Sequence, residues 1–219
     1  MNQKSIGDRL QQAWMNNLLI AVNVLVFAVG MAGTGRWRDP GSLYRAGALY
    51  APLLLKGQGY YRLLTSIFLH ADLSHLFNNM IVQFAGGEIV EKNLGHVRYG
   101  ILYIVCGIGG NLVSVASDYF KGQYGYSVGA SGAVFGVIGA LLFMILREAM
   151  NRKGAAQGAS QARMKSLVIR AGLMTVYLLY SGWSNPVINQ AAHVGGMVIG
   201  FVLTTVLLPR GDSDLSDLL

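Results

Sequence analysis

The sequence predicts an all-α membrane protein, a bundle of six transmembrane helices with a long structured loop after the first helix. Composition is the first reason: 53% of the 219 residues are hydrophobic and 12% are charged, whereas soluble domains average about 25% charged residues. The second reason is that six apolar segments each approach the roughly 20 residues needed to cross a bilayer. No alternating strand pattern is present, and helices satisfy their backbone hydrogen bonds internally, as lipid requires.

The apolar segments define the bundle in chain order. They are predicted at 14–33, 71–91, 99–118, 128–147, 167–184 and 190–208. The chain therefore divides into a short N-terminal tail at 1–13, a membrane domain at 14–208 and a short acidic tail at 209–219.

Two of the connections differ in character. The stretch 34–70 contains Trp37 and several tyrosines, and these residue types favour the membrane interface. We therefore interpret this stretch as a structured loop that lies there. The connection 148–166 is rich in Arg, Lys, Gly, Gln and Ser, which is typical of a solvated loop.

The distribution of basic residues predicts the orientation. With the N-terminus in the cytoplasm, the inner side carries ten Lys and Arg and the outer side six, leaving out Arg170 inside the fifth segment. An inner excess is the usual arrangement, so we expect both termini to be cytoplasmic, in a bacterial inner membrane. The net charge of +7 fits phospholipid headgroups, and no basic helix interleaved with aromatic residues indicates a nucleic-acid partner.

This orientation brings distant polar residues to one depth. The second, fourth and sixth segments all run from the outside inward, so their first turns share one leaflet. The second segment opens with His75 and Asn79, the fourth with Ser131 and the sixth with His193. Polar residues inside a membrane are costly, and they are functional candidates for that reason.

These residue types fit nucleophilic catalysis. A serine hydroxyl is a weak nucleophile that needs an adjacent base, and histidine is the usual base because its pKa lies near neutrality. Oxyanions need preorganised donors. His75 and Asn79 are four residues apart and share a helix face, so they can supply donors together with the backbone N–H of Ser131.

Small and aromatic residues surround the candidate pair. Gly129 and Gly132 flank Ser131 and allow close backbone approach. Gly132 also belongs to a GxxxG pattern, and Gly196 belongs to a ladder of small residues in the sixth segment; such faces let helices approach closely. Phe135 lies one turn after Ser131, where its ring can support an imidazole.

Other interpretations exist for each residue alone. A single membrane serine usually bonds a carbonyl of its own helix, and a single membrane histidine usually serves as an interhelical hydrogen-bond partner. His70 and His75 suggest a metal, but no HExxH pattern and no converging carboxylate accompany them, so we expect no metal and no cofactor. Cys106 is expected to be a small buried apolar residue.

The alternative to an enzyme is a non-catalytic membrane scaffold or a small transporter. A transporter would place charges deep in its spans and would use discontinuous helices. The predicted segments are nearly free of charge at depth, with Glu88, Glu91 and Arg170 as exceptions. The shared depth of the serine, the histidines and the asparagine therefore favours the enzyme.

At this point the chain resembles the rhomboid intramembrane serine proteases over nearly its whole length. The resemblance rests on Tyr61-Arg62, on the run His70 to His75 to Asn79, on Gly87-x3-Glu91-x3-Gly95, on Gly129-Ala130-Ser131-Gly132 and on Ala192-His193-x-Gly195-Gly196. It implies an endopeptidase that cleaves in or near transmembrane helices of membrane proteins, with those helices and the bilayer as partners.

The resemblance also implies roles for individual residues. Ser131 corresponds to the nucleophile and His193 to the base, while His75 and Asn79 correspond to the oxyanion donors. The supporting positions are a structural histidine, His70; the arginine that anchors the first loop, Arg62; an internal carboxylate, Glu91; and the packing residues Gly129, Gly132, Phe135 and Gly196.

The chain departs from the family pattern at two aromatic positions. Tyr61 stands where many members have tryptophan, and Phe135 stands where some have tyrosine; both keep an aromatic ring. Because the resemblance is to a family with a Ser–His dyad, we expect that neither Asp72 nor Asp118 completes a triad.

Overall fold

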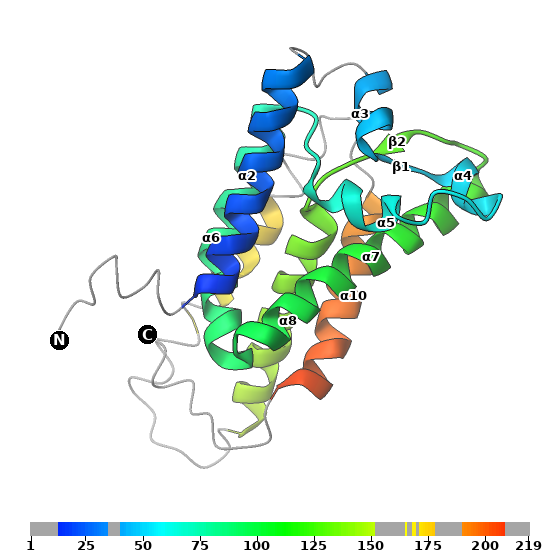
Figure 1. Cartoon of the computed structure of the whole chain (residues 1–219). Coiled ribbons are helices and arrows are strands. Elements are labelled where there is room, and N and C mark those ends of the chain that lie inside the picture. Colours follow the sequence, from blue (N-terminus) through cyan, green and yellow to red (C-terminus); the bar gives the residue numbers. More distant parts are fainter. Residues whose placement is uncertain are drawn as a thin grey trace.

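The computed structural model describes residues 13–34, 40–151, 165, 168–169, 171–177 and 190–208. Its long helices are α2 (Trp14–Thr34), α6 (Leu73–Leu94), α7 (His96–Lys121), α8 (Ser131–Asn151) and α10 (Gln190–Leu207). They lie within a few residues of five of the predicted segments (Figure 1). Both tails, most of the 148–166 connection and much of the predicted segment 167–184 lie outside the described residues.

Four of these helices, α2, α7, α8 and α10, are long and apolar enough to cross a membrane. Helix α6 has 22 residues, but Glu88, Glu91 and Lys92 make its C-terminal end more polar. Residues 171–177 are helical and belong to the predicted fifth segment. The described part of the chain is therefore a mostly helical polytopic membrane fold.

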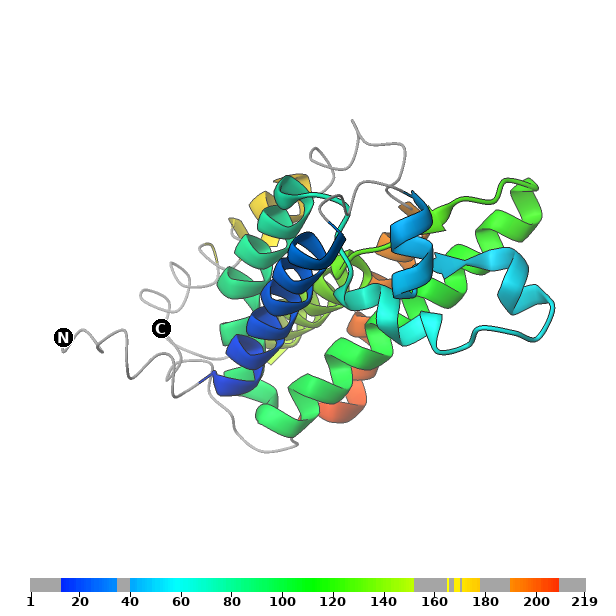
Figure 2. The ribbon, with the colours of Figure 1, turned by 45° about the horizontal axis from the view of Figure 1, so that its top comes forward.

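The loop predicted at 34–70 is folded. It contains α3 (Pro40–Ala46), β1 (Leu49–Tyr50), α4 (Ala51–Leu55), α5 (Arg62–Thr65) and the 3-10 helix η1 (Ser66–Phe68). Helices α4 and α5 pack against α7, and the turned view shows them on the side of the bundle away from α6, whereas η1 contacts α2 (Figure 2). This placement brings the loop to the end of the bundle where α8 and α10 begin.

A short β ladder modifies the all-α prediction. Strand β1 pairs antiparallel with β2 (Tyr126–Ser127), with Leu49 opposite Ser127 and Tyr50 opposite Tyr126. Strands of two residues have no alternation that a sequence pattern can reveal. The ladder ties the first loop to the segment that leads into α8.

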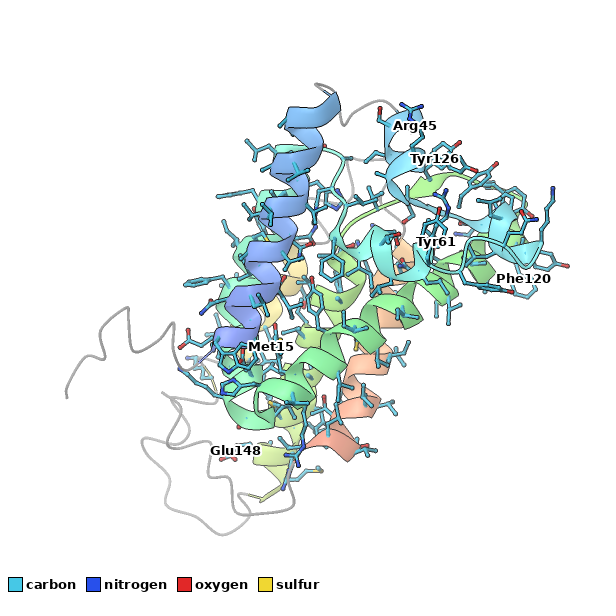
Figure 3. All side chains as sticks on the ribbon, viewed as in Figure 1. Met15, Arg45, Tyr61, Phe120, Tyr126 and Glu148 are labelled. Atoms are coloured by element: carbon cyan, nitrogen blue, oxygen red, sulfur yellow. The ribbon has the colours of Figure 1, made fainter. Side chains whose placement is uncertain are left out.

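Arg62 connects α5 to the beginning of the first loop. Its side chain is buried, and Nη1 donates to the carbonyls of Tyr44 at 2.7 Å and Ala48 at 2.8 Å. The guanidinium also lies over the Tyr44 ring, 4.3 Å from its centroid. Cation–π contact and charge-assisted bonds together hold α3 and β1 against α5. Tyr61 and Tyr126 lie in this region (Figure 3).

Glu91, near the end of α6, joins that helix to the beginnings of α2 and α7. Its fully buried carboxylate accepts the N–H groups of Met15 at 3.0 Å and Asn16 at 2.7 Å, and it contacts Nδ1 of His96. The first N–H groups of a helix have no internal acceptor and carry positive partial charge, so a carboxylate stabilises this end of α2. Met15 marks the place in Figure 3.

The two glycines around Glu91 have separate physical roles. At Gly87 a Cβ would overlap the side chains of Asn16 and Tyr99, which are hydrogen-bonded to each other at 2.7 Å. Gly95 has φ = +81° and ends α6 just before α7 begins. A positive φ of this size favours glycine, which has no Cβ.

Helix α10 packs most extensively against α8 and then against α7. A Cβ at Gly196 would overlap the carbonyl of Gly132, and one at Gly200 would overlap the carbonyl of Gly136. A Cβ at Gly110 of α7 would lie 2.7 Å from the Ala192 carbonyl oxygen. Small residues therefore bring the beginnings of α8 and α10 into backbone contact.

Candidate active site

Ser131 and His193 meet at the beginnings of two packed helices. Ser131 is the first residue of α8, and His193 lies in the first turn of α10. Ser131 Oγ and His193 Nε2 are 2.8 Å apart although the residues are 62 positions apart in the chain. His193 is only 3% exposed. This distance suits proton transfer between a hydroxyl and an imidazole.

The imidazole is oriented by a ring from α8. Phe135 lies one turn after Ser131, and its ring stacks on His193 with centroids 4.4 Å apart and planes 16° apart. The Nδ1 atom of His193 is buried and has no hydrogen-bond partner among the described residues. Stacking and the bond to Ser131 therefore orient this histidine without a carboxylate.

Asp72 has a different task. Its side chain caps α6, where it accepts the N–H of His75 at 2.8 Å and the hydroxyl of Ser74 at 2.6 Å. A capping carboxylate of this kind is ordinary helix chemistry.

The turn before Ser131 requires glycine. Gly129 has φ = +128°, and its N–H donates to the Ser66 carbonyl at 2.9 Å. A Cβ at this position would lie 2.6 Å from Nε2 of His75 and 3.8 Å from Oγ of Ser131. The His75 ring and the Ser131 hydroxyl therefore face the same small region next to the Gly129 backbone.

His70 holds the same turn through a hydrogen bond to its backbone. The ring is fully buried, and its Nε2 accepts the N–H of Ala130 at 3.4 Å. Burial, with a smaller contribution from His75, lowers the pKa of His70 to about 3. The ring is therefore neutral at physiological pH, which leaves Nε2 free to accept a hydrogen bond. His70 also lies edge-on to His75, with centroids 5.1 Å apart.

Asn79 lies one turn below His75 on the buried face of α6. Its Nδ2 donates to the His75 carbonyl at 3.0 Å, and its Oδ1 has no partner among the described residues. A carboxamide nitrogen carries two N–H groups, so one donor remains. Ser131 adds a backbone N–H that has no acceptor inside α8, because it opens that helix. Acyl transfer needs hydrogen-bond donors of this kind near the reacting oxygen.

Sequence reasoning missed several buried polar residues near this site. Asn111 of α7 donates to the Leu63 carbonyl at 2.8 Å and to Ser66 Oγ at 2.9 Å, which fixes η1 beneath Gly129. Gln83 of α6 and Tyr103 of α7 are also fully buried. The cost of polar groups inside a membrane was the signal that would have found them.

The fifth predicted segment contacts α6 beside the site. The hydroxyl of Tyr177 donates to Oδ1 of Asn78 at 2.5 Å. This bond joins the described part of the fifth predicted segment to α6, at the residue before Asn79. The connection 178–189 lies outside the described residues.

Comparisons with known proteins agree on one family. The rhomboid domain matches residues 57–210. RHOMBOID-like protein 5 of Arabidopsis thaliana is 36% identical over 169 residues, which cover 77% of this chain and 50% of that protein. RHOMBOID-like protein 6, mitochondrial, of the same plant is 30% identical over 241 residues, covering 96% of this chain and 74% of that protein.

A bacterial relative is similar to the same degree. Rhomboid protease GluP of Bacillus subtilis (strain 168) is 30% identical over 196 residues, which cover 88% of this chain and 35% of that protein. The chain therefore spans half or less of two of these three relatives. The family includes serine intramembrane proteases as well as proteins named only rhomboid-like.

The matched region contains every residue of the site described above, from Arg62 through Ser131 to His193. It also contains α6, α7, α8 and α10, the helices that hold the site. The chain belongs to the rhomboid family of integral multi-pass membrane proteins.

Proposed function

We propose that this protein is an intramembrane serine endopeptidase that hydrolyses peptide bonds in or near transmembrane helices of membrane proteins. The observation that carries the proposal is the 2.8 Å contact between Ser131 Oγ and His193 Nε2. A serine with an adjacent base is the arrangement that turns a hydroxyl into a nucleophile.

The reaction proceeds through an acyl-enzyme. Ser131 Oγ attacks the carbonyl carbon of the scissile bond, and its proton passes to His193 Nε2. His193 then gives this proton to the departing amine nitrogen as the C–N bond breaks, which leaves an ester on Ser131. Water attacks the ester carbonyl, gives a proton to His193 and releases the acid, and His193 returns the proton to Oγ.

The oxyanion of each tetrahedral intermediate is held by the Asn79 amide, the His75 ring and the Ser131 N–H. These donors come from two helices that are fixed in place before substrate arrives, so no reorganisation is required as charge develops. His75 donates from Nε2, the atom that lies nearest the Gly129 backbone.

Substrate reaches the site from the side, between α6 and the fifth helix. A transmembrane helix has no exposed backbone, so it has to unwind where the bond is cut. The Tyr177–Asn78 hydrogen bond holds this entrance, between α6 and the fifth helix, in its closed conformation. The full domain covers 14–208, with 167–184 as the fifth of six spans, and both termini lie in the cytoplasm of a bacterial cell.

Labelling by a serine-directed fluorophosphonate tests the proposal. The detergent-solubilised wild type should be labelled, whereas Ser131→Ala and His193→Ala should not, and Ser74→Ala is the matched control with an exposed serine. In proteoliposomes, the wild type and Ser74→Ala should cleave a transmembrane substrate, whereas Ser131→Ala and His193→Ala should not. The double variant Ser131→Ala/His193→Ala should be no worse than either single one, because nucleophile and base act as a unit.

Cleavage by purified Ser131→Ala would refute the proposal. A folded wild type that is neither labelled nor active would favour the alternative of a non-catalytic membrane scaffold.

A further inference from the structure

Asn78 is a polar residue beside the lipid-facing side of α6. The large exposed apolar residues of that helix recur every three or four positions and so share one face: they are Leu73, Phe77, Ile81 and Phe84. Asn78 follows Phe77 at the edge of this face and is partly exposed. A polar side chain inside a membrane is costly, and it is a functional candidate for that reason. The mechanism proposed above uses Asn79 and gives the Asn78 carboxamide no role toward the substrate.

The described part of the fifth predicted segment meets α6 in two ways. Ala171, Met174 and Tyr177 are spaced by three residues and share a helix face. Ala171 and Met174 are buried, and a Cβ at Gly86 of α6 would lie 3.4 Å from Met174 Sδ. Tyr177 is 38% exposed, and its hydroxyl donates to Asn78 Oδ1 at 2.5 Å. The two elements are therefore packed at Gly86 and hydrogen-bonded at Asn78.

Separating Tyr177 from Asn78 leaves two polar groups in apolar surroundings. Among the described residues, the Asn78 side chain has no hydrogen bond other than the one to Tyr177. A substrate helix that enters between α6 and the fifth helix takes the place of Tyr177 beside Asn78. If that helix is apolar at this level, the carboxamide stays unpaired, which is unfavourable. A hydroxyl or carboxamide side chain of the substrate removes this cost, because Asn78 can donate from Nδ2 and accept at Oδ1.

We propose that Asn78 is a specificity-determining residue that hydrogen-bonds a hydroxyl or carboxamide side chain in the transmembrane helix of the substrate. The inference rests on the proposed function, because it requires the substrate to enter between α6 and the fifth helix. It adds a substrate class: membrane proteins with Ser, Thr, Asn or Gln at the level of Asn78 are preferred over proteins that are apolar there. Asn78 precedes the oxyanion donor Asn79 in the chain, so we expect the selected residue close to the cleaved bond.

The test compares substrates that differ only by threonine or valine at one position of the transmembrane helix. Both side chains branch at Cβ and have a similar shape, so the pair isolates the hydroxyl from a change in helix stability. Threonine is placed at one position at a time along the helix around the cleaved bond, and kcat/KM is measured in proteoliposomes. A hydrogen bond between membrane helices changes an equilibrium by roughly threefold to thirtyfold. For the wild type we therefore expect the threonine substrate to be favoured about tenfold over the valine substrate at one position.

Two variants separate recognition of the substrate from closure of the entrance. Asn78→Leu keeps the approximate shape of the side chain and removes the amide, so the preference for threonine should disappear. Tyr177→Phe breaks the same hydrogen bond but leaves the carboxamide in place, so it should change both rates by the same factor and keep the preference. Asn93→Leu is the matched control that should also keep the preference, because it removes a buried carboxamide near the other end of α6, where Nδ2 donates to the Ile89 carbonyl.

Three results would overturn the inference: a wild type without a preference for threonine at any position, an Asn78→Leu enzyme that keeps the wild-type preference, or a Tyr177→Phe enzyme that loses it. Labelling of Ser131 by a fluorophosphonate shows whether the dyad is intact in each variant. If leucine disturbs the site, Asn78→Ala removes the same carboxamide with less bulk, and its preference decides in the same way. A wild type that is neither labelled nor active on any of these substrates would instead refute the proposed function, so the two failures are distinguishable.

Discussion

Replacing Gly196 by alanine should pull the catalytic pair apart. A Cβ at Gly196 would lie well inside 3.0 Å of the Gly132 carbonyl oxygen, and the obstacle is backbone that no side-chain rotation can remove. Helix α10 then has to retreat from α8. Because Ser131 and His193 sit at the adjoining ends of these helices, the 2.8 Å between Oγ and Nε2 should lengthen beyond hydrogen-bond reach.

The structure sets the size of this effect. Relief of the overlap requires a shift of roughly 1 Å, and misplacement by that amount costs about 10²-fold in rate. Overpacking of this kind costs about 1–3 kcal/mol of stability. The variant should therefore melt earlier than the wild type, yet remain folded at room temperature with strongly reduced activity.

The assay combines kcat on a transmembrane substrate with the rate of fluorophosphonate labelling, since both need an activated Ser131. Gly33→Ala is the matched control: it makes the same change in a helix where a Cβ meets nothing within 4 Å. A Gly196→Ala protein with the wild-type kcat and labelling rate would refute the reasoning that helix spacing sets the dyad distance.

Three further predictions concern other parts of the site. Asn79→Ala and His75→Ala should each lower kcat, by up to the 10²–10³-fold typical of one lost oxyanion donor, with the remaining donors preventing complete loss; wild-type single-turnover rates for both would contradict their assignment. Tyr177→Phe breaks the bond to Asn78 and should raise the cleavage rate of a transmembrane substrate or leave it unchanged, with no effect on labelling by a small fluorophosphonate; slower cleavage would contradict a closing role for this bond. The pKa of His70 is lowered from 6.5 to about 3 in the folded protein, so the unfolded chain binds more protons between these two pH values. The contribution of His70 to the free energy of unfolding is therefore complete above pH 6.5. It is lost as the pH falls toward 3, by about 1.4 kcal/mol per pH unit. A plot of Tm against pH should be flatter for His70→Gln than for wild type in this range, and parallel plots would contradict a buried neutral ring.

The positions of the long helices could be predicted from the sequence because lipid imposes a single strong requirement. A segment that crosses a bilayer has to be apolar over about 20 residues and has to satisfy its own backbone. The predicted segment 99–118 accordingly lies inside α7 and 190–208 matches α10 to one residue. Helix α8 begins at Ser131, three residues later than predicted, because the Gly129 turn and its neighbour Ala130 are held by Ser66 and His70.

Short elements and buried partners were not predictable in the same way. The two-residue strands β1 and β2 carry no periodic pattern. They form because two segments far apart in the chain pair with each other, and Arg62 holds the residue before β1 in place. Asp72 is a residue type that can complete a catalytic triad, but its carboxylate accepts hydrogen bonds from Ser74 and His75 and caps α6 instead. The Gln83 carboxamide accepts from Tyr103, which accepts from Asn23, and these two partners come from two other helices.

Hydrophobicity and side-chain chemistry are local properties, so the membrane class, the order of the apolar segments and the residue types able to carry the chemistry could be predicted from the sequence. The 2.8 Å contact of Ser131 with His193, the stacking of Phe135 and the partners of Glu91 and His70 depend on tertiary packing. A hydrogen bond depends on a few tenths of an ångström between groups from different helices, and that spacing follows from how glycines such as Gly196 let α8 and α10 pack.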